Sequence, residues 1–263
     1  MMSVFSWMSD NRTETARVLF VQAALVAAVL ALWQFAPDLV HFDELLMSKP
    51  SSIAERTIQW IGSGILLTQG LATLKVVAGG LLFGGIVGFL VGLCAGLIPP
   101  VERMVEPVIS AFFALPKSSL VPLFILWFGI STKQHIIFAS LIVFFFFFFS
   151  TVQGIRSVPK SLNDMLSIIG ASPFQKFYLL YLPASFKWLL TGARLALPHA
   201  FTGAISAEII ASFDGLGYLV KANAGIMDAA GMFSAIFFLL AMSVLISSTA
   251  LFLGRRLQTR FNL

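Results

Sequence analysis

Long apolar runs are the feature that most constrains what this chain can fold into. A helix needs about 20 apolar residues to cross the hydrocarbon core of a bilayer. Six stretches meet this requirement, at about residues 18–35, 70–98, 104–130, 135–155, 188–212 and 232–253. Only 11% of the 263 residues are charged, against about 25% in an ordinary soluble domain. We therefore expect an all-α membrane protein with about six transmembrane helices.

Six crossings and their connections use almost the whole chain. We expect residues 1–17 to form an N-terminal segment and residues 18–263 a single transmembrane domain, with no room for a separate catalytic domain. The third run contains Pro107, Pro116 and Pro122, so we expect it to be kinked or broken. Ser52 and Glu55 have the spacing of a capping box. They predict a short amphipathic helix, ending near residue 61, that lies at the membrane surface.

The distribution of Lys and Arg predicts the orientation. Cytoplasmic connections of membrane proteins carry an excess of these residues. With a cytoplasmic N-terminus, ten lie inside and four outside: Arg12, Arg17, Arg103, Arg156, Lys160, Lys176, Lys187, Arg255, Arg256 and Arg260 against Lys49, Arg56, Lys133 and Lys221. We expect a bacterial inner-membrane protein with both termini in the cytoplasm. The net charge of +5 then reflects these segments, and we expect no nucleic-acid partner.

Motifs for catalysis or metal binding are missing from the sequence. It has one cysteine, Cys94, and no Cys/His metal spacing. It has no G-x-S-x-G nucleophile motif, no H-E-x-x-H string and no nucleotide-binding P-loop. We therefore expect no catalytic residue, no metal and no cofactor on this chain. Uphill transport would need a partner that supplies the energy.

The connection at residues 156–187 is the longest hydrophilic one in the second half of the chain. Pro159 predicts the start of a short helix, with Ser161 or Asn163 as its cap, and Gly170 predicts a sharp turn at its end. Apolar residues give this cytoplasmic helix an apolar face. The helix can pack on its own bundle or dock on a separate protein, and the pattern leaves both open.

This connection resembles the cytoplasmic signature of binding-protein-dependent ABC transporter permeases. That signature reads Glu-Ala-Ala, three residues, Gly, nine residues, Ile-x-Leu-Pro. Here Asp164-Met165-Leu166 stands at Glu-Ala-Ala, Gly170 at the glycine, and Leu180-Tyr181-Leu182-Pro183 at the end. Asp keeps the charge, whereas Met and Leu are bulkier than Ala. The segments PLFILWFGIS, TGARLAL and SAEIIASFDGLGYLV are similar to the nitrate/sulfonate/taurine branch, so that the resemblance covers roughly residues 60 to 255.

The resemblance implies a type I ABC importer permease bundle, with residues 160–172 as the coupling helix. This helix would sit in a groove on a cytoplasmic ATPase subunit. The residues implied in coupling are Asp164, Met165, Leu166, Ile169, Gly170, Ala171, Leu182 and Pro183. The implied partners are a second permease copy in a homodimer, two ATPase subunits that bind ATP and Mg, and an extracytoplasmic solute-binding protein.

A glycine stripe marks the second apolar run. A glycine recurs every fourth residue, at Gly80, Gly84, Gly88, Gly92 and Gly96. Small residues at this spacing let another helix approach closely in a membrane. We expect this stripe to be a helix-packing surface.

Polar residues inside the apolar runs are candidates for a translocation pathway. A charge at the depth of Lys117 costs about 2.5–3.5 kcal/mol on insertion scales, so it should face a watery cavity or a partner. An ion pair or a carbonyl contact is the rival role. His199 can be a packing residue or a ligand-binding one, and Glu208 a gate, an ion-pair partner or a binding-protein contact. The full candidate set is Lys117, Ser118, Ser119, His199, Thr202, Ser206 and Glu208.

Together these features predict a permease that moves a small anionic solute inward by alternating access, coupled to a separate ATPase. The anionic class is implied by the resemblance, with faint support from Lys117. A thiamine-precursor pyrimidine or an aromatic carboxylate is the alternative solute. The run of six phenylalanines at residues 144–149 fits lipid contact and packing, with an aromatic channel as the rival. A membrane-embedded enzyme and a structural membrane protein are the alternatives from other classes.

Overall fold

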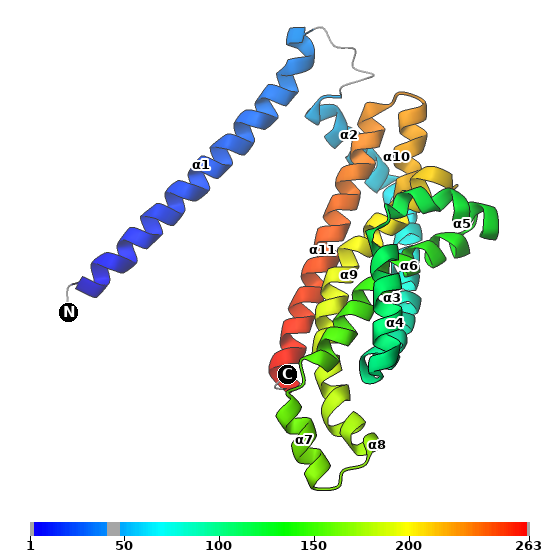
Figure 1. Ribbon diagram of the computed structural model, residues 1–263. Helices are drawn as coiled ribbons and strands as arrows, with labels where there is room; N and C mark the ends of the chain where they lie inside the picture. Colours follow the sequence, from blue (N-terminus) through cyan, green and yellow to red (C-terminus); the bar gives the residue numbers. More distant parts are fainter. Residues whose placement is uncertain (1–2, 41–47, 262–263) are drawn as a thin grey trace.

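The computed structural model describes residues 3–40 and 48–261 of the chain. Within these ranges every regular element is helical (Figure 1). The elements are α1 (Ser3–Val40), α2 (Pro50–Gly62), α3 (Ile65–Leu97), α4 (Pro99–Ala114), η1 (Lys117–Leu120), α5 (Val121–Phe128), α6 (Thr132–Arg156), α7 (Lys160–Ile168), α8 (Pro173–Lys176), η2 (Phe177–Tyr181), α9 (Leu182–Ala211), α10 (Leu216–Gly225) and α11 (Ala229–Phe261). The fold class is all-α, as the composition predicts.

Helices α3 and α6 pack in parallel along the glycine stripe. A methyl group placed on Gly80 would lie 2.7 Å from Cβ of Ala139, and one on Gly92 would lie 2.8 Å from Cβ of Thr151. The intervening contacts advance along both helices in the same direction, with Gly84 against Ser140 and Val143, and Gly88 against Phe144. Only glycine allows the two backbones to come this close.

This parallel packing requires the chain to cross back between the two helices. The elements α4, η1 and α5 make that crossing as a broken unit, bent by 92°. The break falls at Pro116, where Leu115 adopts an extended backbone (φ −66°, ψ 142°), as is usual for a residue before proline. Pro107, in contrast, lies inside α4 without ending it. With this unit counted as one span, the described residues contain six candidate spans, and the prediction of about six is confirmed.

Helix α9 lies antiparallel to α6 and completes the core. Gly192 of α9 contacts Ser150 near one end of the pair. At the other end, Nε2 of His135 lies 2.7 Å from the carbonyl oxygen of Ala211. The apolar residues between α3, α6 and α9 are fully or almost fully buried: Val76, Val77, Ala139, Val143, Phe147, Ala196, Leu197, Ala200, Phe201 and Ala204. These three helices therefore form the packed centre of the molecule.

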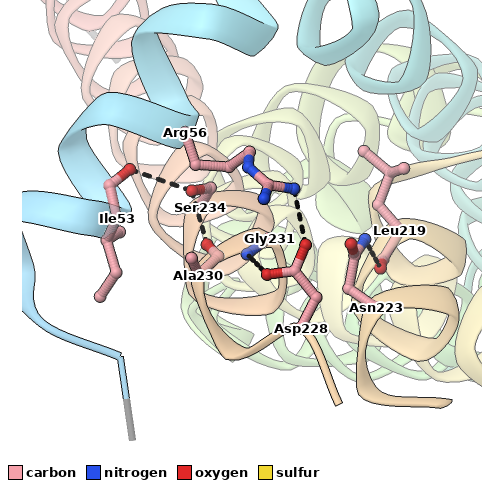
Figure 2. Close-up of polar contacts among 8 residues, drawn as sticks. All are labelled: Ile53, Arg56, Leu219, Asn223, Asp228, Ala230, Gly231 and Ser234. Atoms are coloured by element: carbon pink, nitrogen blue, oxygen red, sulfur yellow. Dashed lines mark hydrogen bonds and ion pairs between the residues drawn. The ribbon is translucent and has the colours of Figure 1, made fainter. Parts of the chain in front are cut away.

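One end of the bundle, which we call the α10 end, gathers α2, α10 and the start of α11 (Figure 1). Figure 2 shows how they are joined. Arg56 of α2 forms an ion pair with Asp228 at 2.6 Å, and the hydroxyl of Ser234 in α11 donates to the carbonyl of Ile53 at 3.1 Å. The predicted start of α2 is wrong. The helix begins at Pro50 with Lys49 as its cap and no capping side chain, because proline is favoured in the first helical turn.

The opposite end, which we call the α7 end, carries α7 and α8 together with the C-terminal end of α11 (Figure 1). Helix α1 diverges from the bundle and contacts it near the α10 end. There, Trp33 packs edge-on against Phe233 at 5.6 Å, and the amide of Gln34 donates to the hydroxyl of Ser51. The side chains of residues 17–32 are all exposed, so this apolar stretch is left for lipid or a partner to cover.

Candidate functional site

The start and the end of helix α7 are determined by the backbone conformations of Pro159 and Gly170. Its start differs from the prediction: Pro159 is the N-cap, no side chain caps the helix, and the Pro159 carbonyl already accepts a bond from the amide of Leu162. At its end Gly170 has φ +77°, and the amide of Ala171 donates to the carbonyl of Leu166 at 2.9 Å. A left-handed glycine closing a helix in this way forces a sharp turn.

A second short helix, α8, is joined to α7 by a side-chain hydrogen bond. Ser172 and Gln175 form a reciprocal capping box at its start. The ammonium of Lys176 donates to the hydroxyl of Ser167 at 2.5 Å. Trp188 then donates to the hydroxyl of Ser157 at 3.2 Å, which ties the start of α9 to the end of α6. The α7–α8 unit is therefore a defined hairpin.

The α7–α8 hairpin presents an uncovered apolar surface. No residue of α7 is buried. Ile168 is 85% exposed and Phe174 is 75% exposed. Burying such a side chain contributes about 1.5–3 kcal/mol, and an exposed apolar patch of this kind marks an interaction surface. The helix does not bury its apolar face on its own bundle.

The predicted coupling residues all lie on this hairpin or directly after it. Six of them are on α7 and its closing turn. Asp164, Met165, Ile169 and Gly170 are exposed, and Leu166 and Ala171 are half-buried. Leu182 and Pro183 form the first turn of α9, so that the hairpin is continuous with a core helix through the π-helical turn η2.

A second candidate region runs along one side of α4, α6 and α9. A cavity of about 340 Å³ opens between these helices toward the α7 end. Its lining mixes charged, polar and aromatic residues: Glu106, Phe149, Ser150, Val152, Gln153, Arg156, Trp188, Thr191 and Leu195. We call this surface the α4–α6–α9 face.

The α4–α6–α9 face ends in an ion-pair cluster that the sequence analysis missed. Arg156, in the last turn of α6, pairs with Glu102 at 2.7 Å and with Glu106 at 2.6 Å. The two carboxylates are four residues apart on α4 and so lie on one side of that helix. The four-residue spacing of the two glutamates is a signal for a shared basic partner, but it does not identify Arg156 as that partner.

Lys117 and His199 come together on the same face, farther along α6. The ammonium of Lys117 donates to the carbonyl of Phe113 at 2.6 Å and lies 4.3 Å above its ring. Phe113 contacts Phe146 edge-on at 5.9 Å, and Phe146 stacks on His199 at 4.4 Å. We call these four residues the ring cluster. The carbonyl contact proposed as the rival role of Lys117 is present.

The remaining hydroxyl candidates lie around the ring cluster. Ser118 and Ser119 are exposed in η1, next to Lys117. Thr202 is exposed and Ser206 is half-buried on α9. Thr202 and Ser206 follow His199 by three and seven residues, which places all three on one side of a helix.

Glu208 does not join the other pathway candidates. It follows His199 by nine residues, which places it on the opposite side of α9. It is 1% exposed and accepts bonds from the hydroxyl of Thr73 and the amide of Gly217, both at 2.9 Å. The amide of Leu216 in turn donates to the Thr73 hydroxyl at 2.8 Å. Glu208 therefore joins α9, α3 and α10, on the side of α9 that faces away from His199.

This separation bears on the membrane-enzyme alternative. An enzyme would need Lys117, His199 and Glu208 at one site, and the structure divides them between two faces. Among the residues that the structure describes, no three His, Cys, Asp or Glu side chains come together as metal ligands.

Comparison with known proteins connects these surfaces to a family. Residues 80–262 match the family described as binding-protein-dependent transport system inner membrane component. The formylaminopyrimidine transport permease protein of Halalkalibacterium halodurans is 31% identical over 82% of this chain and 86% of its own length. The riboflavin transport system permease protein of Chloroflexus aurantiacus is 32% identical over 79% and 78%. The taurine transport system permease protein of Escherichia coli is 28% identical over 80% and 78%.

Solved structures share the fold at low sequence identity. A chain of the MetNI methionine ABC transporter, in an inward-facing conformation, superimposes with a TM-score of 0.63 at 19% identity, covering 73% of this chain and 95% of that one. A chain of a bacterial ABC transporter that imports alginate gives 0.62 at 15% identity, covering 94% and 99%. With the family match over most of its length, this chain belongs to the inner-membrane permeases of binding-protein-dependent ABC transporters.

Proposed function

We propose that this chain is the translocating subunit of an ATP-driven importer, and that its α7–α8 hairpin docks in a groove on a separate cytoplasmic ATPase subunit. The uncovered apolar surface of that hairpin is the observation that carries the proposal. Ile168, Ile169 and Phe174 are each more than two-thirds exposed, in a segment that is otherwise held in place by polar contacts. A partner that covers these side chains would gain hydrophobic free energy without having to order the hairpin.

The continuity of the hairpin with α9 supports a mechanical role. Movement of α7 and α8 reaches α9 through η2, and α9 packs on α6 and α3 along most of its length. ATP and Mg would bind on two such ATPase subunits. Their closure would tilt the α3–α6–α9 core of each permease copy and switch the pathway between inward and outward access.

The remaining partners follow from the same assembly. A second copy of this chain would complete the pathway, with the α4–α6–α9 faces turned toward one another as a homodimer. An extracytoplasmic solute-binding protein would deliver the solute at the α10 end. The α7 end would then be cytoplasmic, which agrees with the excess of Lys and Arg in the segments placed there.

We further propose that the solute is a small anion. Lys117 supports this proposal, because its ammonium lies on the α4–α6–α9 face and forms no ion pair with a carboxylate among the described residues. The relatives are named for formylaminopyrimidine, riboflavin and taurine transport. Their names alone therefore do not narrow the chemical class of the solute.

The docking proposal can be tested by adding one positive charge to the apolar surface of the hairpin. Ile168→Lys places an ammonium in the centre of the exposed apolar surface, and Ser161→Lys places the same group on an exposed polar position of α7. The ATPase subunit of the same transporter would be co-expressed and co-purified with each variant. We expect Ile168→Lys to lower its capture and the ATP-dependent uptake at least tenfold, and Ser161→Lys to leave both near the wild-type level.

A second variant disturbs the hairpin in a different way, so that the conclusion does not depend on one substitution. Gly170→Pro is incompatible with φ +77°, because proline holds φ near −65°, so it should disturb the turn while the spans still insert. ATPase capture and uptake that match the wild type in both Ile168→Lys and Gly170→Pro would overturn the docking proposal.

A further inference from the structure

A groove of about 650 Å³ lies between α3, α5 and α6. We call it the α3–α6 groove. Helix α6 contributes a row that begins with Lys133 at the α10 end and continues through Ile137, Leu141 and Phe144. Phe83 and neighbouring residues of α3 form the opposite wall. The groove therefore follows the length of α6 and has its one lysine at one end.

The walls of the α3–α6 groove are apolar, and its floor is closed by the glycine stripe. A methyl group on Gly84 would lie 2.9 Å from the Cα of Ser140, so the two helices touch at the bottom of the groove. The hydroxyl of Ser140 donates to the carbonyl of Ile136 at 2.7 Å and is thus satisfied within α6. Among the described residues that line the groove, Lys133 alone is charged.

The α3–α6 groove faces away from the surface proposed for the pathway. Ile137 and Leu141 precede Phe146 and Ser150 by nine residues each, which places the two pairs on opposite sides of α6. Phe146 belongs to the ring cluster, and Ser150 lines the cavity of the α4–α6–α9 face. An apolar groove on the outer side of a membrane helix meets the acyl chains of the bilayer.

The depth of Lys133 matches that of a lipid headgroup. Helix α6 has 25 residues, so it is about 37 Å long, against a hydrocarbon core of about 30 Å. Lys133 is in its first turn, and a lysine near the end of a span extends its ammonium to the interface. From there the groove descends to Phe144, about 16 Å farther along the helix. A phosphate at one end and an acyl chain along the rest would fit this layout.

The charge of Lys133 has no structural use within the chain. Its side chain is exposed and forms no ion pair among the described residues. The first turn of α6 contains no acidic residue. A cation is unfavourable at the N-terminus of a helix, where the macrodipole is positive. A phosphate bound there would be stabilised by the ammonium and by the dipole together.

We propose that the α3–α6 groove is a binding site for an anionic phospholipid. One acyl chain would lie between α3 and α6, and the phosphate would pair with the ammonium of Lys133. This site is separate from the pathway and from the ATPase-docking hairpin, so the inference goes beyond the proposed function. Phosphatidylethanolamine carries an ammonium that opposes Lys133, whereas phosphatidylglycerol carries none. We therefore expect an approximately fivefold preference for phosphatidylglycerol, as for one basic residue near an anionic surface.

The test uses a tryptophan in the groove and lipids with bromine in the middle of their acyl chains, which quench tryptophan on contact. The five native tryptophans are replaced by phenylalanine, and Phe83→Trp supplies the reporter. Gly84 contacts Ser140, so residue 83 lies about 10 Å below Lys133, at the depth of the bromine. The full-length chain is reconstituted without ATPase in mixtures of brominated and plain phosphatidylglycerol and phosphatidylethanolamine.

Matched variants separate this site from the surrounding lipid. Leu82→Trp places the same reporter on an exposed position of α3 outside the groove, and should show equal quenching by the two lipids. With Trp at position 83, Lys133→Gln should abolish the preference for phosphatidylglycerol. Lys221→Gln, which removes an exposed lysine of α10 that bonds the Ile210 carbonyl, should leave it unchanged.

Three results would overturn the inference. Equal quenching by both lipids at position 83 would mean that the groove holds only unselected bilayer lipid. A preference that survives Lys133→Gln would place the headgroup elsewhere. If neither lipid quenched the reporter at position 83 while both quenched the one at position 82, protein such as a second copy of the chain would cover the groove. None of these results bears on ATPase docking, which is measured separately.

Discussion

At the scale of single residues, the position of a polar side chain around its helix decides its role more than its identity does. His199 and Glu208 both lie in α9, and both are polar residues inside an apolar run. His199 is exposed on the α4–α6–α9 face, whereas Glu208 is buried and accepts bonds from α3 and from the first turn of α10. The imidazole of His199 is exposed, and the carboxylate of Glu208 joins three helices.

Glu208 provides a prediction at this scale. Both donors, the Thr73 hydroxyl and the Gly217 amide, reach the same oxygen, Oε2. Glu208→Gln can keep an oxygen there, so we expect near wild-type stability and uptake. Glu208→Leu leaves two buried donors unsatisfied, at about 1–3 kcal/mol each. We expect a clearly lower thermal unfolding midpoint in detergent micelles.

The exposed residue Glu55 of α2 supplies the control, since Glu55→Leu removes no buried bond. If Glu208→Gln abolished uptake while the unfolding midpoint stayed unchanged, Glu208 would be acting as a pathway group, and its structural assignment would have to be withdrawn.

At the scale of elements, the glycine stripe of α3 sets how closely the core helices approach. A methyl group on Gly88 would lie 2.5 Å from the carbonyl oxygen of Phe144. Backbone atoms cannot rotate away from such a contact, so the two helices would have to separate along their length.

We therefore expect Gly88→Ala to destabilise the bundle by about 1–3 kcal/mol, the usual cost of overpacking. Thermal unfolding of the purified chain would measure it. Gly62→Ala, at the end of α2, is the matched control, because a methyl group there meets nothing within 4 Å. Equal unfolding midpoints for the two variants would mean that α3 and α6 are not in the close contact described.

At the scale of the whole molecule, the parallel packing of α3 and α6 determines the number of crossings. The bent α4–η1–α5 unit returns the chain to the α10 end, so that α7 and α10 lie at opposite ends of the bundle. The positive-inside rule predicts that the α7 end is cytoplasmic.

Single cysteines would test this topology. In a Cys94→Ser background, Ala224→Cys places an exposed thiol on α10, and Ser161→Cys places one on α7. The chain would be expressed without partner subunits, and intact spheroplasts would be treated with a membrane-impermeant maleimide. We expect labelling of the α10 cysteine alone, and labelling of both after lysis. Labelling of the α7 cysteine in intact spheroplasts would reverse the orientation.

The sequence by itself was sufficient for the features that depend on local chemistry. Apolar length predicts the spans, the three prolines of the third run predict that it is kinked or broken, and the signature around Gly170 predicts the α7 turn. Each of these is decided within one continuous segment of the chain. The same signature indicated the family, which the match over residues 80–262 confirms.

Only the tertiary structure decided which side chains share a face. It joined Arg156 to Glu102 and Glu106, placed Lys117 and His199 in one ring cluster, and moved Glu208 to a different network. Nothing in the local sequence reveals these groupings, because in an apolar helix every side is hydrophobic and the periodicity does not mark an inner one. The neighbouring helices determine which side of an apolar helix faces the core and which side faces outward.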